Sequence, residues 1–426
     1  MNPMSIERRQ LLLGGLGGLL GLISSASLAD VLIGDDKSAV DGDGLLASQL
    51  RLGELLIRYL AGRKDPAAKD PAKDAAGNVV VSPGSLAAIL SFVDLGGSNS
   101  MHAAIHQALG FRRAARRQAV RDLATLRTGV SGLIGQSRKD GPLVLANLIA
   151  FDRVVRPKQL AMYGLSGAGA DVLVDNLADA KVIDRINGWV KQKTHELIPE
   201  IIGEAPETLG LVAVNALYFK DKWQTPFEPS RTRPEQFQTM SGKPVDVQMM
   251  HSKLGKFRFR QDDRFIAAEL PYANANFRLV VATTKSAPAP AQDFAAVAGW
   301  LDGKGFAAQN GEIALPRLSL SSAGELLPPL DAFGLKAARG TADALEGFSD
   351  EPLQIARIVQ KVELRVNEEG TEGAAATAVL TTRGLGTPDH IQMTVDKPFV
   401  FALRDERTGL VLFMGYVGAP PSGGRA

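Results

Sequence analysis

The stretch Asn367-Glu-Glu-Gly-Thr-Glu-Gly-Ala-Ala-Ala-Thr-Ala378 separates two strand-like runs, Val359–Val366 and Met393–Leu403. An ordinary loop would carry more proline, asparagine and charge, and a helix needs a cap and an apolar stripe that are not clear here. With a period of two, one face is small and uncharged, so this stretch can join a sheet without overfilling the layer beneath it. That face carries Thr371, Gly373, Ala375, Thr377 and Val379, and the other carries Glu372, Ala374, Ala376, Ala378 and Leu380. We interpret it as a loop that can become a strand.

Length and composition allow a large core and exclude several kinds of chemistry. The chain has 426 residues, 45% of them hydrophobic, and a net charge of +2. Length alone suggests two or three domains, although single domains of this size exist. The small net charge does not select nucleic acid or an acidic partner. Because the sequence has no cysteine, disulfides, thiol nucleophiles and thiolate metal sites are excluded.

The first 29 residues have the pattern of an export signal. Arg8-Arg9 precede an apolar run, Leu11–Ile23, that is too short to span a membrane, and Ser27-Leu-Ala29 offers a cleavage site. The text Glu7-Arg-Arg-Gln-Leu-Leu-Leu13 resembles a twin-arginine signal, which favours a bacterial protein exported folded to the periplasm or the medium. A general secretory signal is the alternative. No second apolar run reaches spanning length, so the mature protein is expected to be soluble.

The hinge-like stretch resembles a known family. Val366-Asn-Glu-Glu-Gly-Thr-Glu-Gly-Ala-Ala-Ala-Thr377 is similar to the hinge of the reactive loop in serpins, the serine protease inhibitors. Asn215-Ala-Leu-Tyr-Phe-Lys-Asp-Lys-Trp223 resembles the serpin text Asn-Ala-Ile-Tyr-Phe-Lys-Gly-Lys-Trp. Asp396-Lys-Pro-Phe-Val-Phe401 and Leu412-Phe-Met-Gly-Tyr-Val417 resemble the C-terminal strands of the family. The likeness is collinear over residues 46–420.

The resemblance implies a fold and a division of the chain. The fold class is α+β, a single serpin domain with a large mixed central sheet, two smaller sheets, about eight or nine helices and an exposed reactive loop. We divide the chain into a signal peptide (1–29), a linker (30–45), the serpin domain (46–420) and a disordered tail (421–426). Within the domain, Ser82 and Pro83 suit the start of a helix, and a first helix is expected over Ser48–Leu60.

The same resemblance implies a function without catalysis or a cofactor. In serpins a protease cuts the loop, and the hinge inserts into the large sheet as a new strand before the acyl-enzyme is hydrolysed. The hinge residues are Glu368, Glu369, Gly370, Thr371, Glu372, Gly373, Ala374, Ala375, Ala376 and Thr377. Neither charge nor proline interrupts the face that would be buried, which favours an inhibitor over the alternative, a non-inhibitory binding or chaperone-like serpin.

The loop tip is expected to select the target serine protease. Family spacing places the cut at Gly384-Leu385, but glycine is a poor anchor for a protease pocket. Arg383 would suit a trypsin-like enzyme, and Leu385 would suit an elastase- or chymotrypsin-like enzyme. We favour Arg383-Gly384; the alternative explanation for Arg383 is a solubilising loop charge.

A run of arginines and a few histidines are the other candidate sites. Arg112, Arg113, Arg116, Arg117 and Arg121 can gather on one side of a helix, where some serpins bind polyanions such as heparin; a solvated helix face is the better explanation. His102 and His106 are spaced for zinc on a helix but lack the metalloprotease glutamate, so a packing pair is favoured. The Gly-rich segment Gly164–Gly169 is predicted to be a turn.

Overall fold

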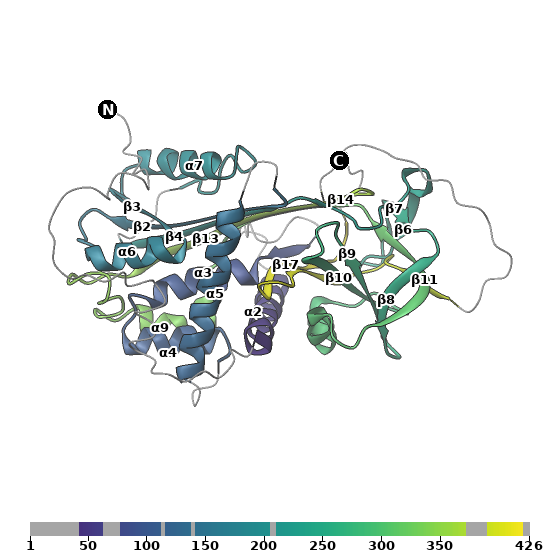
Figure 1. Ribbon diagram of the computed structural model, residues 1–426, viewed down its shortest axis with the longest axis horizontal. Helices are drawn as coiled ribbons and strands as arrows, with labels where there is room; N and C mark the ends of the chain where they lie inside the picture. Colours follow the sequence, from purple (N-terminus) through teal and green to yellow (C-terminus); the bar gives the residue numbers. More distant parts are fainter. Residues whose placement is uncertain are drawn as a thin grey trace, which may run out of the picture. The chain divides into compact units, whose positions relative to one another are not determined.

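The computed structural model describes residues 42–62, 77–111, 116–137, 141–204, 210–371 and 390–420. All of them belong to one compact unit that spans Val40–Ala426. Its described residues contain eight α-helices, which pack against two sheets (Figure 1). The helices are α2 (Gly42–Gly62), α3 (Pro83–Asp94), α4 (Asn99–Ala108), α5 (Arg116–Gln136), α6 (Gln159–Ala168), α7 (Lys181–Lys193), α8 (Leu327–Leu330) and α9 (Lys336–Arg339). The expected α+β class is confirmed.

A seven-stranded sheet holds the segments that matter most for function. Its order is β3 (Asp171–Asp175), β2 (Leu143–Asp152), β4 (Leu211–Phe219), β13 (Ile355–Val366), β14 (Gly370–Thr371) and β5 (Asp221–Lys222), and β12 (Leu318–Glu325) pairs with β13. The pairs β2–β3 and β4–β13 are parallel, whereas β12–β13 and β2–β4 are antiparallel. This is the large mixed sheet that the sequence predicted.

The two faces of this sheet bury different sets of side chains. Alternate residues of β2 and β4 point to one face, where they pack with Val182, Ile186 and Val190 of α7. The other residues of these strands join the main core with α3. Figure 1 shows α7 on one side of the sheet and α3 and α5 on the other. Since both faces are covered, every residue of β2 and β4 is buried, as continuous apolar runs predict.

The second sheet has ten strands and differs from the expectation of two separate small sheets. It contains β1 (Val79–Val81), β17 (Leu410–Val417), β16 (Phe399–Asp405), β10 (Phe277–Thr284), β9 (Phe265–Pro271), β8 (Gly255–Gln261), β11 (Ala307–Pro316), β7 (Val245–His251), β6 (Arg233–Phe237) and β15 (Ile391–Thr394). The two expected sheets are joined because β11 is long. Its first half pairs with β8 and its second half with β7 and β15.

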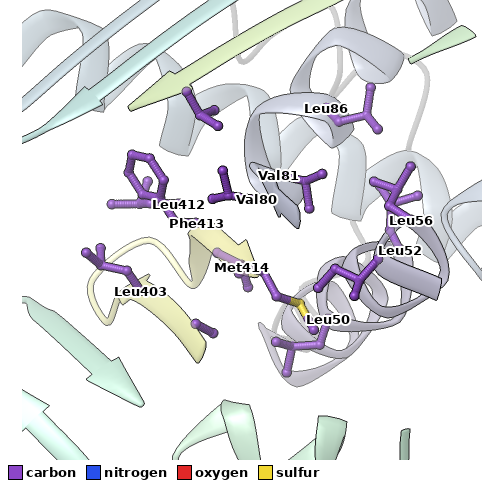
Figure 2. Close-up of a cluster of buried hydrophobic side chains, with 14 of the residues drawn as sticks. Leu50, Leu52, Leu56, Val80, Val81, Leu86, Leu403, Leu412, Phe413 and Met414 are labelled. Atoms are coloured by element: carbon purple, nitrogen blue, oxygen red, sulfur yellow. The ribbon is translucent and has the colours of Figure 1, made fainter. Parts of the chain in front are cut away.

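The main core joins the two ends of the described chain. Figure 2 shows Leu52 of α2, Val80 of β1 and Phe413 of β17 in one cluster of buried side chains. Val79 lies opposite Tyr416 in the β1–β17 ladder, so the first and last strands of the described residues pair with each other. At the end of β1, the Ser82 side chain caps α3 by accepting a hydrogen bond from the Ser85 backbone N–H, and Pro83 occupies the first turn as predicted.

Two sequence-based predictions were wrong. The run Met393–Leu403 is not one strand, because β15 pairs with β11 and β16 pairs with β10 and β17. Pro398 stands between them and has no N–H for a ladder. The segment Gly164–Gly169 is not a turn, because α6 continues to Ala168 and Gly169 ends it with φ 99°.

Three other predictions can be placed only in part. The helix expected over 48–60 is present, but α2 begins at Gly42, inside the stretch assigned to a linker. The signal peptide (1–29) and the tail (421–426) lie outside the described residues. In the part of the chain that is described, no helix has the length and apolarity needed to cross a membrane.

Candidate functional site: the hinge seat

The beginning of the hinge occupies a defined place at one end of the seven-stranded sheet. After β13 the chain turns tightly at Asn367, whose N–H donates to the Gly370 carbonyl (2.8 Å). Gly370 and Thr371 then form β14, which lies antiparallel between Val366 of β13 and β5. We call this place the hinge seat: residues 367–371 together with β5, Trp223 and Tyr272.

Glycine is required at the bottom of this seat. Gly370 has φ 155° and lies opposite Lys222 in the β14–β5 ladder. A Cβ atom there would come within 2.1 Å of the Asp221 carbonyl oxygen and 2.9 Å of the Trp223 nitrogen. Both contacts are with backbone, so no side-chain movement relieves them.

Glu368 anchors the hinge through a partly buried ion pair. Its side chain is 7% exposed, and Arg317 approaches it with Nη2 at 2.7 Å and Nε at 2.9 Å from Oε1. The Thr232 hydroxyl donates to the same oxygen. Burial acts to raise the pKa of Glu368, but the hydrogen bonds from Arg317 and Thr232 outweigh burial and the net pKa is lowered. Glu368 is therefore ionised at neutral pH and fixed to the end of β11.

Backbone bonds hold the same turn from the other side. The N–H of Phe227 donates to the Glu368 carbonyl (2.8 Å), and the N–H of Trp223 donates to the Glu369 carbonyl (2.7 Å). The indole Nε1–H of Trp223 donates to the Asn367 carbonyl (2.9 Å). The segment after β5 thus donates hydrogen bonds to three successive carbonyl groups of the turn.

Thr371 is the last hinge residue that the structure describes, and it is fully buried. Its hydroxyl is hydrogen-bonded to the Tyr272 hydroxyl, with 2.8 Å between the oxygens. The Tyr272 ring stacks on Trp223 at 4.4 Å and meets Phe219 edge-on at 5.0 Å. The pocket for this side chain is therefore small, aromatic and closed, with one polar partner.

Beneath the seat, β4 and β13 pair directly with each other. The parallel register runs from Ile355 opposite Leu211 to Glu363 opposite Tyr218. These strands must separate if a further strand is to enter between them. The seat lies at the end of this parallel pair, and β14 is antiparallel to both of its neighbours.

A buried polar cluster fastens this strand pair to α3. The Gln360 Oε1 accepts from the Ser82 N–H (2.8 Å), and its Nε2 donates to the Ser82 carbonyl (3.1 Å). The Asn215 amide donates to Asn147 Oδ1 (2.8 Å) and its own oxygen lies 3.4 Å from Gln360 Nε2. Three strands and the start of α3 therefore meet at one hydrogen-bonded junction.

Gln360→Ala should weaken this junction. The substitution leaves the buried Ser82 N–H without its acceptor, which costs about 1–3 kcal/mol, while the Ser82 carbonyl keeps the Leu86 N–H. We expect the uncleaved protein to unfold about 1–3 °C lower in a thermal melt followed by circular dichroism. Gln309→Ala, which alters an exposed residue of β11, is the matched control; equal midpoints for the two variants would contradict the assigned role of Gln360.

The structure places only part of the predicted site. Glu368, Gly370 and Thr371 are buried in the seat and Glu369 is half-buried. The hinge residues 372–377 and the predicted cut at Arg383, Gly384 and Leu385 lie outside the described residues. Arg112 and Arg113 also lie outside them. Arg116 and Arg117 belong to the backbone of α5, and Arg121 is half-buried on that helix.

Sequence reasoning missed the partners of the hinge. Nothing in the sequence showed that Arg317 would pair with Glu368 or that Tyr272 would bond to Thr371. The histidine pair was placed better. His102 Nδ1 and His106 Nε2 lie 2.7 Å and 3.7 Å from Asp94 Oδ1, a packing contact between α3 and α4. Among the residues that the structure describes, no cluster of side chains is arranged to hold a metal ion.

Comparison with known families agrees with the fold and with the hinge seat. A sequence model of the family Serpin (serine protease inhibitor) matches residues 68–420. This is most of the chain, and it includes both halves of the seat. The chain belongs to the serpin family.

Individual relatives include a protein named as a protease inhibitor. Iripin-2 of Ixodes ricinus is 29% identical over 357 residues, which cover 80% of this chain and 87% of Iripin-2. The leukocyte elastase inhibitor of Sus scrofa is 28% identical over 81% of this chain and 94% of its own. These two relatives, like serine protease inhibitor 42Dd of Drosophila melanogaster, are proteins of animals.

Solved serpin structures share the fold at lower identity. Serpin48 of Tenebrio molitor superposes with a TM-score of 0.74 at 23% identity, over 90% of this chain and all of its own. Native protease nexin-1, crystallised with heparin, gives 0.70 at 22% identity over 89% of this chain and 100% of its own. Human thyroxine-binding globulin superposes with a TM-score of 0.75 at 20% identity, over 89% of this chain and 99% of its own.

Proposed function

We propose that this serpin inhibits serine proteases as a single-use covalent trap. The observation that carries the proposal is the state of the seven-stranded sheet. Strands β4 and β13 pair directly, while Gly370 and Thr371 already lie at their end, antiparallel to β13 and β5. The hinge therefore has its first residues in the register that an inserted strand would continue.

The chemistry of the trap follows from this arrangement. A protease serine attacks the loop and forms an ester with the residue on the hinge side of the cut. The freed hinge can then extend β14 between β4 and β13, replacing one parallel contact with two antiparallel ones. About ten to fifteen new ladder bonds at about 0.5–1.5 kcal/mol each give on the order of 10 kcal/mol. That energy is available to carry the tethered protease away before water cleaves the ester.

Incubation with trypsin tests the trap directly. We expect a band at the summed mass of the two proteins on a denaturing gel, because an ester survives denaturation. Trypsin whose serine has been blocked is the control and should give no such band. Cleavage of the loop without any covalent product, by trypsin and by an elastase and a chymotrypsin, would refute the proposal and favour a non-inhibitory binding or chaperone-like serpin.

Several finer features belong to the same proposal. We propose the cut at Arg383-Gly384, which favours a trypsin-like target. The alternative is Gly384-Leu385, the bond that family spacing indicates, and Leu385 itself would suit an elastase- or chymotrypsin-like enzyme. Mass spectrometry of the trapped complex identifies the bond.

The N-terminal pattern supports export from a bacterial cytoplasm to the periplasm or the medium, by the twin-arginine route. Polyanion binding by the arginines of α5 stays a prediction, supported by the heparin bound to the related nexin-1.

A further inference from the structure

The seat contains a carboxylate that the hinge sequence does not explain. Asp221 stands where the serpin text Asn-Ala-Ile-Tyr-Phe-Lys-Gly-Lys-Trp has glycine, and it lies directly opposite Thr371 in the β14–β5 ladder. Residues directly opposite in an antiparallel ladder point to the same face. The Asp221 side chain therefore lies on the same face of the sheet as Thr371, the face on which Thr371 meets Tyr272.

Two backbone N–H groups hold this carboxylate. Asp221 Oδ1 accepts from the Lys222 N–H (2.9 Å), and Oδ2 accepts from the Asn274 N–H (3.2 Å). Asn274 belongs to the turn between β9 and β10, which also donates the Ala273 N–H to the Lys222 carbonyl (2.7 Å). The carboxylate thus ties β5, one wall of the seat, to the turn that follows Tyr272.

The surroundings of Asp221 make this tie sensitive to its charge. Burial raises the pKa of Asp221, and the N–H groups of Asn274 and Lys222 lower it by less. The titratable group that faces it from the second sheet is the Tyr272 phenol, whose pKa is raised by burial, lowered by Thr371 and raised by the charge of Asp221. The other charged groups near Asp221 lie on two segments. Lys220 and Lys222, on its own segment, are exposed. On the hinge turn, Glu368 is paired with Arg317 and Glu369 is half-buried.

We propose that Asp221 is a positioning residue for loop insertion: its ionised carboxylate holds β5 against the β9–β10 turn and so keeps the seat shaped for Gly370 and Thr371. The inference rests on the trap mechanism proposed above, in which these two residues begin the inserted strand. A protonated Asp221 has one good acceptor oxygen instead of two and no charge, so the tie weakens as the pH falls. A neutral amide at this position also has one acceptor oxygen, and keeps at most one of the two bonds.

Asp221→Asn should therefore slow insertion in the assembled trap. Loss of one hydrogen bond to a charged group corresponds to about a tenfold change in rate. We expect at least about threefold more inhibitor to be consumed per protease trapped at pH 8, because slower insertion lets more ester hydrolyse. Asp262→Asn is the matched control, since Asp262 accepts the N–H groups of Arg264 and Phe265 in a turn of the second sheet away from the seat. The proposal is overturned if Asp221→Asn consumes as much inhibitor per protease trapped as the wild type does, or if Asp221→Asn and Asp262→Asn raise this consumption equally.

A second measurement does not depend on inhibition. In a Trp189→Phe, Trp300→Phe background, Trp223 reports on the seat through its stacking on Tyr272. Because the pKa of Asp221 is raised, we expect the emission of Trp223 to change above the ordinary aspartate pKa of about 3.9 in the uncleaved protein, and this transition to vanish in Asp221→Asn while persisting in Asp262→Asn. A transition that survives in Asp221→Asn overturns the role of the carboxylate. If no protease is trapped at all, the proposed function fails, and the emission titration still decides whether Asp221 shapes the seat.

Discussion

Replacing Thr371 with arginine is expected to turn the inhibitor into a substrate. Thr371 is fully buried, and its hydroxyl bonds to Tyr272 inside an aromatic pocket formed with Trp223. A guanidinium would have to be desolvated in this closed pocket, where both oxygens of the neighbouring Asp221 already accept backbone N–H groups, and burying a charge in this way costs several kcal/mol. The loop should still be cut, but the hinge can no longer begin its strand, so the ester is hydrolysed and free protease returns.

The measurement is the number of inhibitor molecules consumed per protease trapped, which we expect to rise at least about tenfold. Thr225→Arg is the control, because Thr225 is exposed in the segment between Trp223 and Phe227. It adds the same charge close to the seat without burial. Full inhibition by Thr371→Arg would show that the side chain at this position stays outside the sheet.

Removing Arg317 is expected to have the largest effect on the stability of the uncleaved protein. Arg317→Leu leaves the carboxylate of Glu368 buried without its cation, a change that costs about 3–5 kcal/mol when an internal ion pair is broken. For a protein of this size we expect the midpoint of thermal unfolding to fall by roughly 5 °C. Adding Glu368→Gln to Arg317→Leu should recover most of the loss, because the unpaired charge is then gone.

The same ion pair gives a dependence on pH. The pKa of Glu368 is lowered in the folded protein. The stability that this ion pair contributes is therefore fully present above the pKa of Glu368 in the unfolded chain, which is near 4.3, and is lost as the pH falls through the lower pKa of the folded protein. The difference in stability between the wild type and Arg317→Leu should therefore be largest at neutral pH and shrink below about pH 4. A difference that is constant from pH 7 to pH 3 would contradict the assigned pair.

Arg339→Leu, which breaks the pair with Asp331 away from the seat, should lower stability without changing how much inhibitor each protease consumes.

The sequence predicted the strands better than the contacts between them. The continuous apolar runs of β2 and β4 are typical of strands that are buried on both faces, and the Ser82 cap was predicted because its geometry is local. The run from Met393 to Leu403 was misread because apolar residues continue across the break at Pro398. The glycines at 164 and 167 suggested a turn, yet they lie in α6, where a Cβ would meet only open space.

The hinge seat shows why the rest was out of reach. Period-two alternation placed Thr371 on a small face, but its partner Tyr272 is 99 residues away and the partner of Glu368, Arg317, is 51 residues away. Neither partner has a property in the sequence that points to the hinge. Such contacts depend on the register of several strands at once, and a single sequence carries no direct record of it.

The position of the last strand has a consequence for biosynthesis. Because β17 lies between β1 and β16, with all of its residues buried, a nascent chain on the ribosome cannot complete its core until nearly the whole polypeptide has emerged. Pairing across such a separation is slow, and the waiting intermediate exposes apolar strands that can aggregate. A cell that makes this protein therefore has to protect it from off-pathway association until translation ends.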